Sequence, residues 1–181
     1  MATPPFSYPW YAAMAGDDLE QGDILESCPV FLPPSDLASH VRSEAVFRWE
    51  TRDLILMSQS CDLVRGREKI TDVLFCAVWK RSEINLALDQ LEQVRKGGMP
   101  TLHILAECSL NSLQREVSVV DFRCVHSLPV QFVRERCVST GRRLRLLPPY
   151  REHLSQAFAR FFMRVGLPVD IPPFRKPREV N

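Results

Sequence analysis

The run Asp53–Ser58, with the sequence DLILMS, constrains the fold of this chain more than any other segment. Its near-continuous apolar character is typical of a central strand. The run leads directly into Ser58–Asp62 (SQSCD), whose side chains are small, polar or reactive. We therefore expect a buried strand that either feeds an ordinary turn or carries chemistry out to a surface.

Six more segments have the composition of strands, because β-branched, aromatic and other apolar residues recur in them between turn-forming residues. A further segment, 126–136, is ambiguous. The six expected strands are 21–33, 44–50, 70–80, 101–108, 116–125 and 141–147.

Two segments predict helices, near 82–97 and 149–165. Ser82 can serve as the N-cap of the first, and the glycine pair that starts at Gly97 ends it. The second begins after two prolines, places its apolar residues on one face, and ends at a glycine and a proline. Strands and helices together predict a mainly β, α+β fold: a small β-barrel with an inserted helix and a C-terminal helix.

The chain divides into a Pro- and aromatic-rich N-terminal extension (1–20), a single barrel domain (21–168) and a Pro-rich basic tail (169–181). The aromatic residues of the extension either pack on their own domain or dock on a partner. The residues assigned to partner binding are Phe6, Tyr8, Trp10 and Tyr11.

Composition excludes several classes of protein. The net charge of +1 gives no argument for nucleic-acid binding by the whole protein. No apolar segment is long enough to span a membrane and no secretory signal is present, so a cytoplasmic protein is expected. The six cysteines lie far apart without metal-ligand spacing, which predicts reduced thiols, no metal and no cofactor.

Arginines dominate the segment 134–164, and two interpretations are open. A solvated arginine-rich face is favoured over a site for carboxylate or phosphate groups. A separate hypothesis makes Cys61, beside Asp62, an activated thiol, which requires a base that the fold brings near it.

The order of several motifs resembles the MazF/PemK/Kid family of growth-inhibiting toxins over residues 21–168. The motifs are Gly22-Asp23-Ile24, the Arg52–Ser58 strand, the strand KITDVLFCAV and Ser118-Val119-Val120. This resemblance implies an SH3-like, PemK-like barrel that is commonly dimeric. It also implies a metal-independent endoribonuclease acting on single-stranded RNA.

By the same resemblance, Arg52 matches the family's catalytic arginine, and Ser58 or Thr71 matches its catalytic hydroxyl. Cleavage through the RNA 2′-OH needs a base, an acid and a cation over the phosphate, but no metal. The residues that we expect to contact RNA are Gln59, Arg65 and Arg67.

Two departures from the family motif favour a different function. Asp53 replaces the proline that follows the arginine, and SQSCD is not a toxin signature. The sequence therefore favours a toxin-derived, protein-binding accessory subunit of a bacterial stress or antiviral defence system. Its expected partner is an antitoxin or a defence-complex subunit. The endoribonuclease is the alternative.

Overall fold

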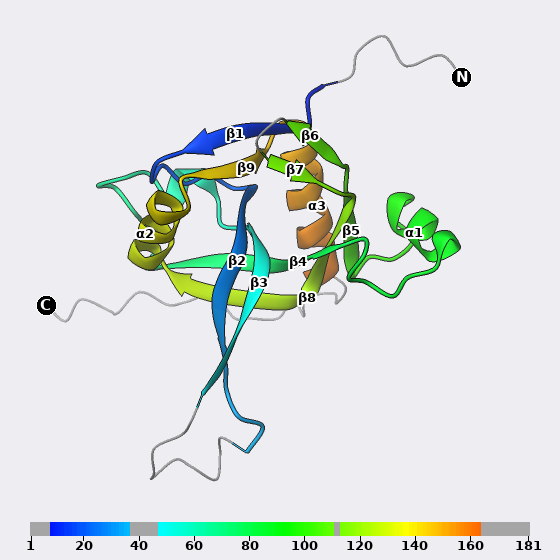
Figure 1. Ribbon diagram of the computed structural model, residues 1–181, viewed down its shortest axis with the longest axis horizontal. Helices are drawn as coiled ribbons and strands as arrows, with labels where there is room; N and C mark the ends of the chain where they lie inside the picture. The colour runs from blue at the N-terminus through cyan, green and yellow to red at the C-terminus, as the bar shows by residue number, and fades with distance from the viewer. Residues whose placement is uncertain (1–7, 37–46, 111–112, 164–181) are drawn as a thin grey trace, which may run out of the picture.

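The computed structural model describes residues 8–36, 47–110 and 113–163. Seven antiparallel strands form one sheet in the order β1-β9-β2-β3-β4-β8-β5, and β6 pairs with β7 in a second sheet (Figure 1). The strands are β1 (Tyr11–Ala15), β2 (Asp23–Leu32), β3 (Arg48–Leu56), β4 (Asp72–Lys80), β5 (Leu102–Leu105), β6 (Cys108–Leu110), β7 (Leu113–Arg115), β8 (Ser118–Pro129) and β9 (Arg142–Leu146). The helices are α1 (Leu88–Arg95), α2 (Val130–Thr140) and α3 (Tyr150–Phe162), and a 3-10 turn, η2, covers Ser60–Asp62.

The prediction of a mainly β fold with helices is confirmed, but the expected closure into a barrel is wrong. β1 and β5 are the two edges of the seven-stranded sheet and do not pair with each other. A side-chain contact replaces the missing ladder, since the Tyr11 hydroxyl donates to the carbonyl of Ala106, just beyond β5, at 2.8 Å. The sheet is therefore open.

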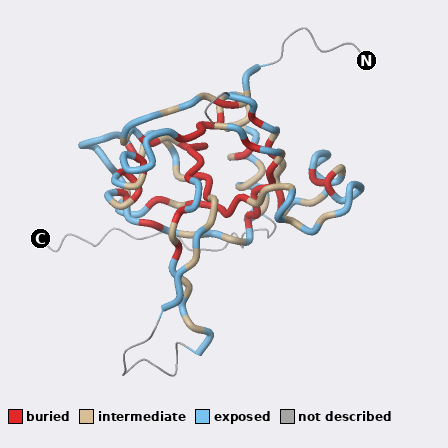
Figure 2. The backbone as a smooth tube through the Cα atoms, in the orientation of Figure 1, coloured by how far each residue is buried: buried red, intermediate tan, exposed pale blue. Residues whose placement is uncertain are grey.

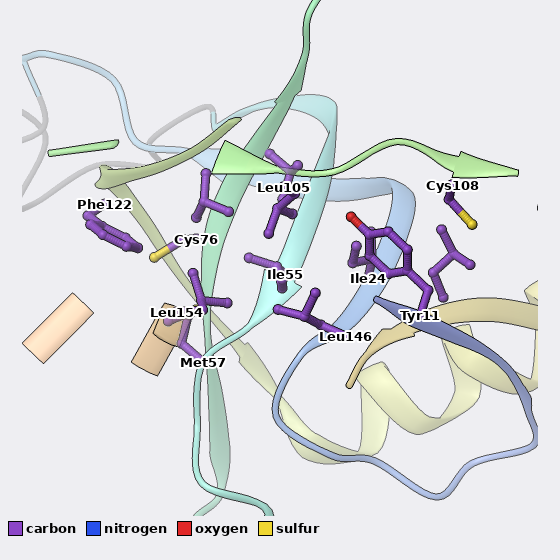
Figure 3. Packing of buried hydrophobic residues seen from close by; sticks show 13 residues of the cluster. Tyr11, Ile24, Ile55, Met57, Cys76, Leu105, Cys108, Phe122, Leu146 and Leu154 are labelled. Atoms are coloured by element: carbon purple, nitrogen blue, oxygen red, sulfur yellow. The ribbon is translucent and has the colours of Figure 1, made fainter. Parts of the chain in front are cut away.

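Both faces of the central strands are covered, which explains the continuous apolar run in β3. Ile55 and Met57 belong to the cluster that includes Leu154 of α3, and Figure 3 shows Leu154 beside Met57. Leu54 and Leu56 point to the opposite face and belong to a second cluster with residues of α2. The four apolar residues, 54–57, are buried because neither face meets solvent there, and Asp53 and Ser58 at the two ends of the run are half-buried.

Several expected boundaries change. The expected strands 44–50 and 53–58 meet in one strand, β3, which runs from Arg48 to Leu56, while residues 44–46 lie outside the described residues. The ambiguous segment divides at Val130, where β8 gives way to α2. The C-terminal helix is confirmed as α3, whereas its expected glycine and proline end, like the tail 169–181, lies outside the described residues.

The inserted helix begins later than expected. Ser82 is not its N-cap, because the Ser82 hydroxyl donates to Glu116 at 2.5 Å. The helix starts at Leu88, where the Gln90 side chain accepts from the backbone N–H of Ala87 at 2.9 Å. Its expected end is confirmed, since Gly97 has a φ of 75° and donates to the Val94 carbonyl.

Part of the predicted N-terminal extension belongs to the sheet. β1 pairs with β9 from Tyr11↔Leu146 to Ala15↔Arg142. Trp10, just before the strand, stacks on Tyr150 of α3 with a ring separation of 3.6 Å. These residues therefore close one side of the domain.

A buried carboxylate joins the start of β2 to β9. Asp23 is fully buried, and its Oδ2 accepts from Arg143 Nε at 2.9 Å while its Oδ1 accepts from Arg145 Nε at 2.5 Å. The same arginines donate to backbone carbonyls of Gly16 and Asp18. The ion pairs therefore fix the β1–β2 connection against β9.

The favoured interpretation of the arginine-rich segment as a solvated face is wrong for three of its members. Arg143 and Arg145 are buried on Asp23, and Arg134 is buried with its guanidinium bonded to the carbonyls of Asp17 and Leu63. Arginine suits such positions because one guanidinium donates to several acceptors at once. These charges hold loops in place and are not a surface for an anionic partner.

We expect Asp23→Ala to lower the free energy of unfolding by about 3–5 kcal/mol, since it leaves two buried guanidinium groups without their counter-charge. Urea unfolding followed by circular dichroism measures the change. Asp89→Ala, at an exposed acid in the first turn of α1, is the matched control and should stay within about 0.5 kcal/mol of wild type. A loss below about 1 kcal/mol for Asp23→Ala would contradict the structural role of the network.

Candidate functional site

The polar stretch 58–62, SQSCD, connects three parts of the fold through hydrogen bonds. After β3 ends, the Ser58 hydroxyl accepts from the Leu74 backbone N–H at 2.9 Å, which continues the pairing toward β4. The Ser60 hydroxyl accepts from the Gln21 N–H at 3.0 Å, and the buried Gln21 side chain donates to the Met57 carbonyl at 2.7 Å. Ser58 and Ser60 therefore have structural partners.

Gly22 allows the Gly-Asp-Ile motif to pack against the end of β3, just before SQSCD. Its N–H donates to the Leu56 carbonyl at 2.8 Å, and its φ is 91°. A Cβ at this position would lie 3.0 Å from the Leu146 Cβ, so any side chain would be strained as well as crowded. Two motifs of the sequence are thus parts of one packing contact.

The SQSCD stretch and α3 enclose a polar cavity of about 380 Å³, which we call the motif cavity. Cys61 is exposed there, with its Sγ 3.6 Å from Asp62 Oδ1. Since no histidine of the described residues lines this cavity, the structure supplies no imidazole base for a catalytic thiol. The lining residues are Gln21, Gln59, Ser60, Cys61, Arg151, Glu152, Ser155 and Gln156.

Arg52 lies at the other end of β3 in a small mixed cluster. Its guanidinium sits over the Trp79 ring, 5.4 Å from the centroid, and it pairs with Glu50 on the same face of the strand. His126 of β8 lies close enough to Arg52 and Glu50 for both charges to affect its pKa. We call Glu50, Arg52, Trp79 and His126 the Arg52 cluster.

His126 is the residue of this cluster that the sequence did not single out. Its Nε2 is buried without a hydrogen-bond partner among the described residues. Burial lowers the pKa of His126, the Arg52 charge lowers it further, and Glu50 acts in the opposite direction. β8 bulges between Asp121 and Val125, directly before this residue, and bulges commonly re-aim side chains next to functional sites.

The structure does not bring the three expected catalytic residues together. Four residues of β3 already carry the chain about 13 Å from Arg52 to Leu56, and Ser58 lies beyond that. The Arg52 guanidinium turns sideways onto β4 and not toward Ser58. The Thr71 hydroxyl donates to Asp72 at 2.7 Å at the far end of β4. One scissile phosphate cannot contact all three.

The expected RNA-binding residues are also dispersed. Gln59 lines the motif cavity, whereas Arg65 pairs with Asp17 at 2.7 Å and lines a different cavity beside α2. Arg67 is exposed in the charged loop, where its N–H closes a turn onto the Val64 carbonyl. These three residues do not line one cavity with Arg52.

Asp53, which stands where the family motif has a proline, has a structural role. Its Oδ1 accepts from the N–H of Ser27 at 2.9 Å, at a bulge of β2 where Ser27 has a φ of 47°. Its Oδ2 accepts from the buried Arg115 at 2.8 Å. The carboxylate therefore supports a strained turn and carries its own counter-charge, so it does not stand as an isolated negative charge beside Arg52.

The aromatic residues proposed for partner binding have different environments. Tyr11 is buried in the core and Trp10 is stacked on Tyr150, so both serve their own domain. Tyr8 is exposed, and Phe6 lies outside the described residues.

Another aromatic surface, which the sequence analysis did not assign, lies on a ribbon formed by β2 and β3. Figure 1 shows the two strands projecting from the body, and among the described strands residues 29–32 and 48–51 pair only with each other. Phe31 and Trp49 form a directly opposed pair with 64% and 66% of their surfaces exposed. Figure 2 shows that much of this ribbon is exposed or intermediate. The only signal in the sequence was the alternation of 44–50.

No helix in the part of the chain that the structure describes is both long and apolar enough to cross a membrane. Within those same residues, no group of three or more His, Cys, Asp or Glu side chains is placed to hold a metal ion.

We expect Arg52→Ala to raise the pKa of His126, because it removes a positive charge that opposes protonation. Glu50→Gln should move the pKa in the opposite direction. The ring protons of His126, followed by NMR as a function of pH, report both changes, and Arg67→Ala is the control at a distant exposed arginine. An unchanged titration midpoint in Arg52→Ala would show that the two residues are not coupled.

The chain matches no protein-family model, and no curated protein matches it in sequence. The resemblance to the MazF/PemK/Kid family therefore stays a prediction that rests on the order of its motifs.

Proposed function

We propose that this protein is a binding subunit that docks a protein partner through the aromatic face of the β2–β3 ribbon. The opposed pair Phe31 and Trp49 carries the proposal, because two large aromatic side chains are exposed side by side on a projecting element. Aromatic residues of this kind dominate the energetics of protein interfaces, and monomeric surfaces rarely gather them without such a use.

The dispersal of the expected catalytic residues supports the same conclusion. Ser58 is bonded to the backbone of β4 and Thr71 to Asp72, so both hydroxyls already have partners. Asp53 and Arg115 reinforce the base of the ribbon from the side. A strand pair that is anchored in this way presents its outer part as a preformed surface, which lowers the entropic cost of binding.

The finer fold assignment belongs to the proposal as well. The antiparallel order β2-β3-β4-β8 runs through the segments that carry the family-like motifs, which supports an open relative of the SH3-like, PemK-like barrel. A role in a stress or antiviral defence system stays a prediction from the sequence resemblance.

The Arg52 cluster favours one alternative, a metal-independent endoribonuclease. Arg52 and Trp79 place a cation and an aromatic ring on which a base can stack on the opposite face of β3 from Trp49, and the charge of Arg52 acts on the imidazole of His126. An imidazole and a guanidinium can act as base and phosphate-stabilising cation in RNA cleavage. In this alternative His126, and neither Ser58 nor Thr71, is the proton-transferring group.

The docking proposal is tested by recovering partners from extracts of the source organism with the full chain. The double variant Phe31→Ser/Trp49→Ser should lose the recovered protein, with binding weakened by about 30-fold or more. Phe162→Ser, at an aromatic residue of α3 that is 60% exposed, is the matched control and should retain it. Recovery of the same protein by the double variant and by Phe162→Ser in equal amounts would show that the ribbon is not the docking surface. Loss of self-association in the double variant alone would identify the partner as a second copy.

The alternative is tested by incubating the purified protein with single-stranded RNA in chelator-treated buffer. We expect no cleavage that depends on the Arg52 cluster. Cleavage by wild type that is abolished in both Arg52→Ala and His126→Ala, but kept in Arg67→Ala, would establish the nuclease and overturn the binding-only function.

A further inference from the structure

A groove that is separate from the ribbon has no part in the proposed function. It lies among the C-terminal end of α1, the edge strand β5 and the outer face of α3, and it encloses about 360 Å³. Cavities of this size hold small organic ligands. It shares no lining residue with the ribbon or with the Arg52 cluster.

The charges in this groove have one sign. Arg95, Lys96 and Arg160 line it, whereas none of its described lining residues is an Asp or a Glu. The whole chain carries nearly equal numbers of basic and acidic residues, 23 and 22, so the asymmetry is local. Such a cavity favours an anionic ligand over a neutral or cationic one.

The cations differ in their availability. Arg95 is held by Glu92 through two contacts of 2.7 and 2.6 Å, and Lys96 also approaches Glu92 at 3.3 Å. Arg160 is exposed and makes no ion pair or hydrogen bond through its side chain with the part of the chain that the structure describes. Its guanidinium can therefore bind a phosphate through two parallel N–H bonds without breaking an existing contact.

α3 presents its polar groups to the groove as one stripe. His153, Gln156 and Arg160 are spaced by three and four residues, so they lie on one face of the helix. The amide, the imidazole and the guanidinium are all hydrogen-bond donors.

The remaining wall is apolar and includes a free sheet edge. Met99, Leu102 and Ile104 line it. Among the described strands, β5 pairs with β8 alone. The Phe122 N–H donates to the Thr101 carbonyl, and because backbone groups alternate in an antiparallel ladder, those of Ile104 point away from β8. The groove thus offers backbone donors and acceptors beside an apolar surface.

His103, also on β5, is an unused polar group in the groove. No hydrogen bond of its ring to the described residues is found, and the ring lies 6.3 Å from that of Phe122. Burial lowers the pKa of His103 to about 4, with a further contribution from His153, so the ring is neutral at pH 7. A neutral imidazole both donates and accepts, which suits the polar edge of a heteroaromatic ring.

We propose that this groove binds a small organic phosphate with a planar body, of the class of nucleoside monophosphates. The phosphate group contacts Arg160, with Gln156, His153 and Lys96 around it. The planar body lies against Met99, Leu102 and Ile104, where His103 and the free edge of β5 supply hydrogen bonds. The site is independent of the docking function.

The test uses calorimetric titration of the full chain with adenosine 5′-monophosphate, adenosine and inorganic phosphate at low salt. We expect the monophosphate to bind with a Kd of about 1 mM or tighter, and the other two ligands to bind at least about tenfold more weakly. Arg160→Gln should weaken binding of the monophosphate by about tenfold or more, because it removes a charge-assisted contact. Arg67→Gln, at an exposed arginine of another loop, should leave it unchanged.

Three outcomes would overturn the proposal. One is the absence of binding by the monophosphate, and another is equal binding by wild type and Arg160→Gln. The third is displacement of the monophosphate by a single-stranded oligoribonucleotide that binds more tightly, which would make the groove a nucleic-acid surface. Amide chemical-shift changes confined to β5 and α3 would place a bound monophosphate in this groove, whereas changes around Cys61 would place it in the motif cavity.

Discussion

The buried carboxylate of Asp23 is the contact on which the arrangement of the chain depends. It accepts from Arg143 and Arg145, more than 100 residues away, and both arginines also hold carbonyls of the β1–β2 connection. A buried ion pair specifies geometry more than it adds stability, because desolvation offsets most of the attraction between the charges. Here it sets where β2 begins. Gly22 and Gln21 are thereby placed against the end of β3.

That geometry separates the two ends of β3. Near its C-terminal end, Ser58, Ser60 and Gln21 are occupied by contacts within the fold. Near its N-terminal end, β3 leaves the body as half of a ribbon, with Trp49 on one face and Arg52 on the other. The polar stretch SQSCD therefore has mainly a structural role, in connecting β3 to the segments around Gln21 and Leu74. The surface available to another molecule lies at the opposite end of the strand.

The sequence predicted those features that depend on local pattern. The apolar run of β3, the proline start of α3 and the glycine end of α1 were each visible in a few adjacent residues. It could not predict the burial of Arg143 and Arg145. The local sequence around an arginine does not show whether its side chain is hydrated or paired with a carboxylate that is distant in the sequence. It missed the late start of α1 because the partner of Ser82, Glu116, is 34 residues away.

In the candidate site, too, the sequence predicted what depends on local pattern and missed what depends on contacts between distant segments. Arg52 was found from its place in a motif, whereas its neighbours Trp79 and His126 come from strands that only the fold brings together. Arg52 and Ser58 lie far apart because the extended chain of β3 separates them and Ser58 follows the end of that strand. Phe31 and Trp49 belong to segments that read as ordinary strands, and only their projection beyond the neighbouring strands exposes them.

The central claim is that the Trp49 face of the ribbon contacts a protein. A photo-crosslinking amino acid placed at position 49 of the full chain, and activated in cells of the source organism, tests it most directly. The account predicts a discrete protein adduct from position 49 and none from the same probe at position 162, which is exposed on α3. RNA as the adduct at position 49, or no adduct at all, would contradict it.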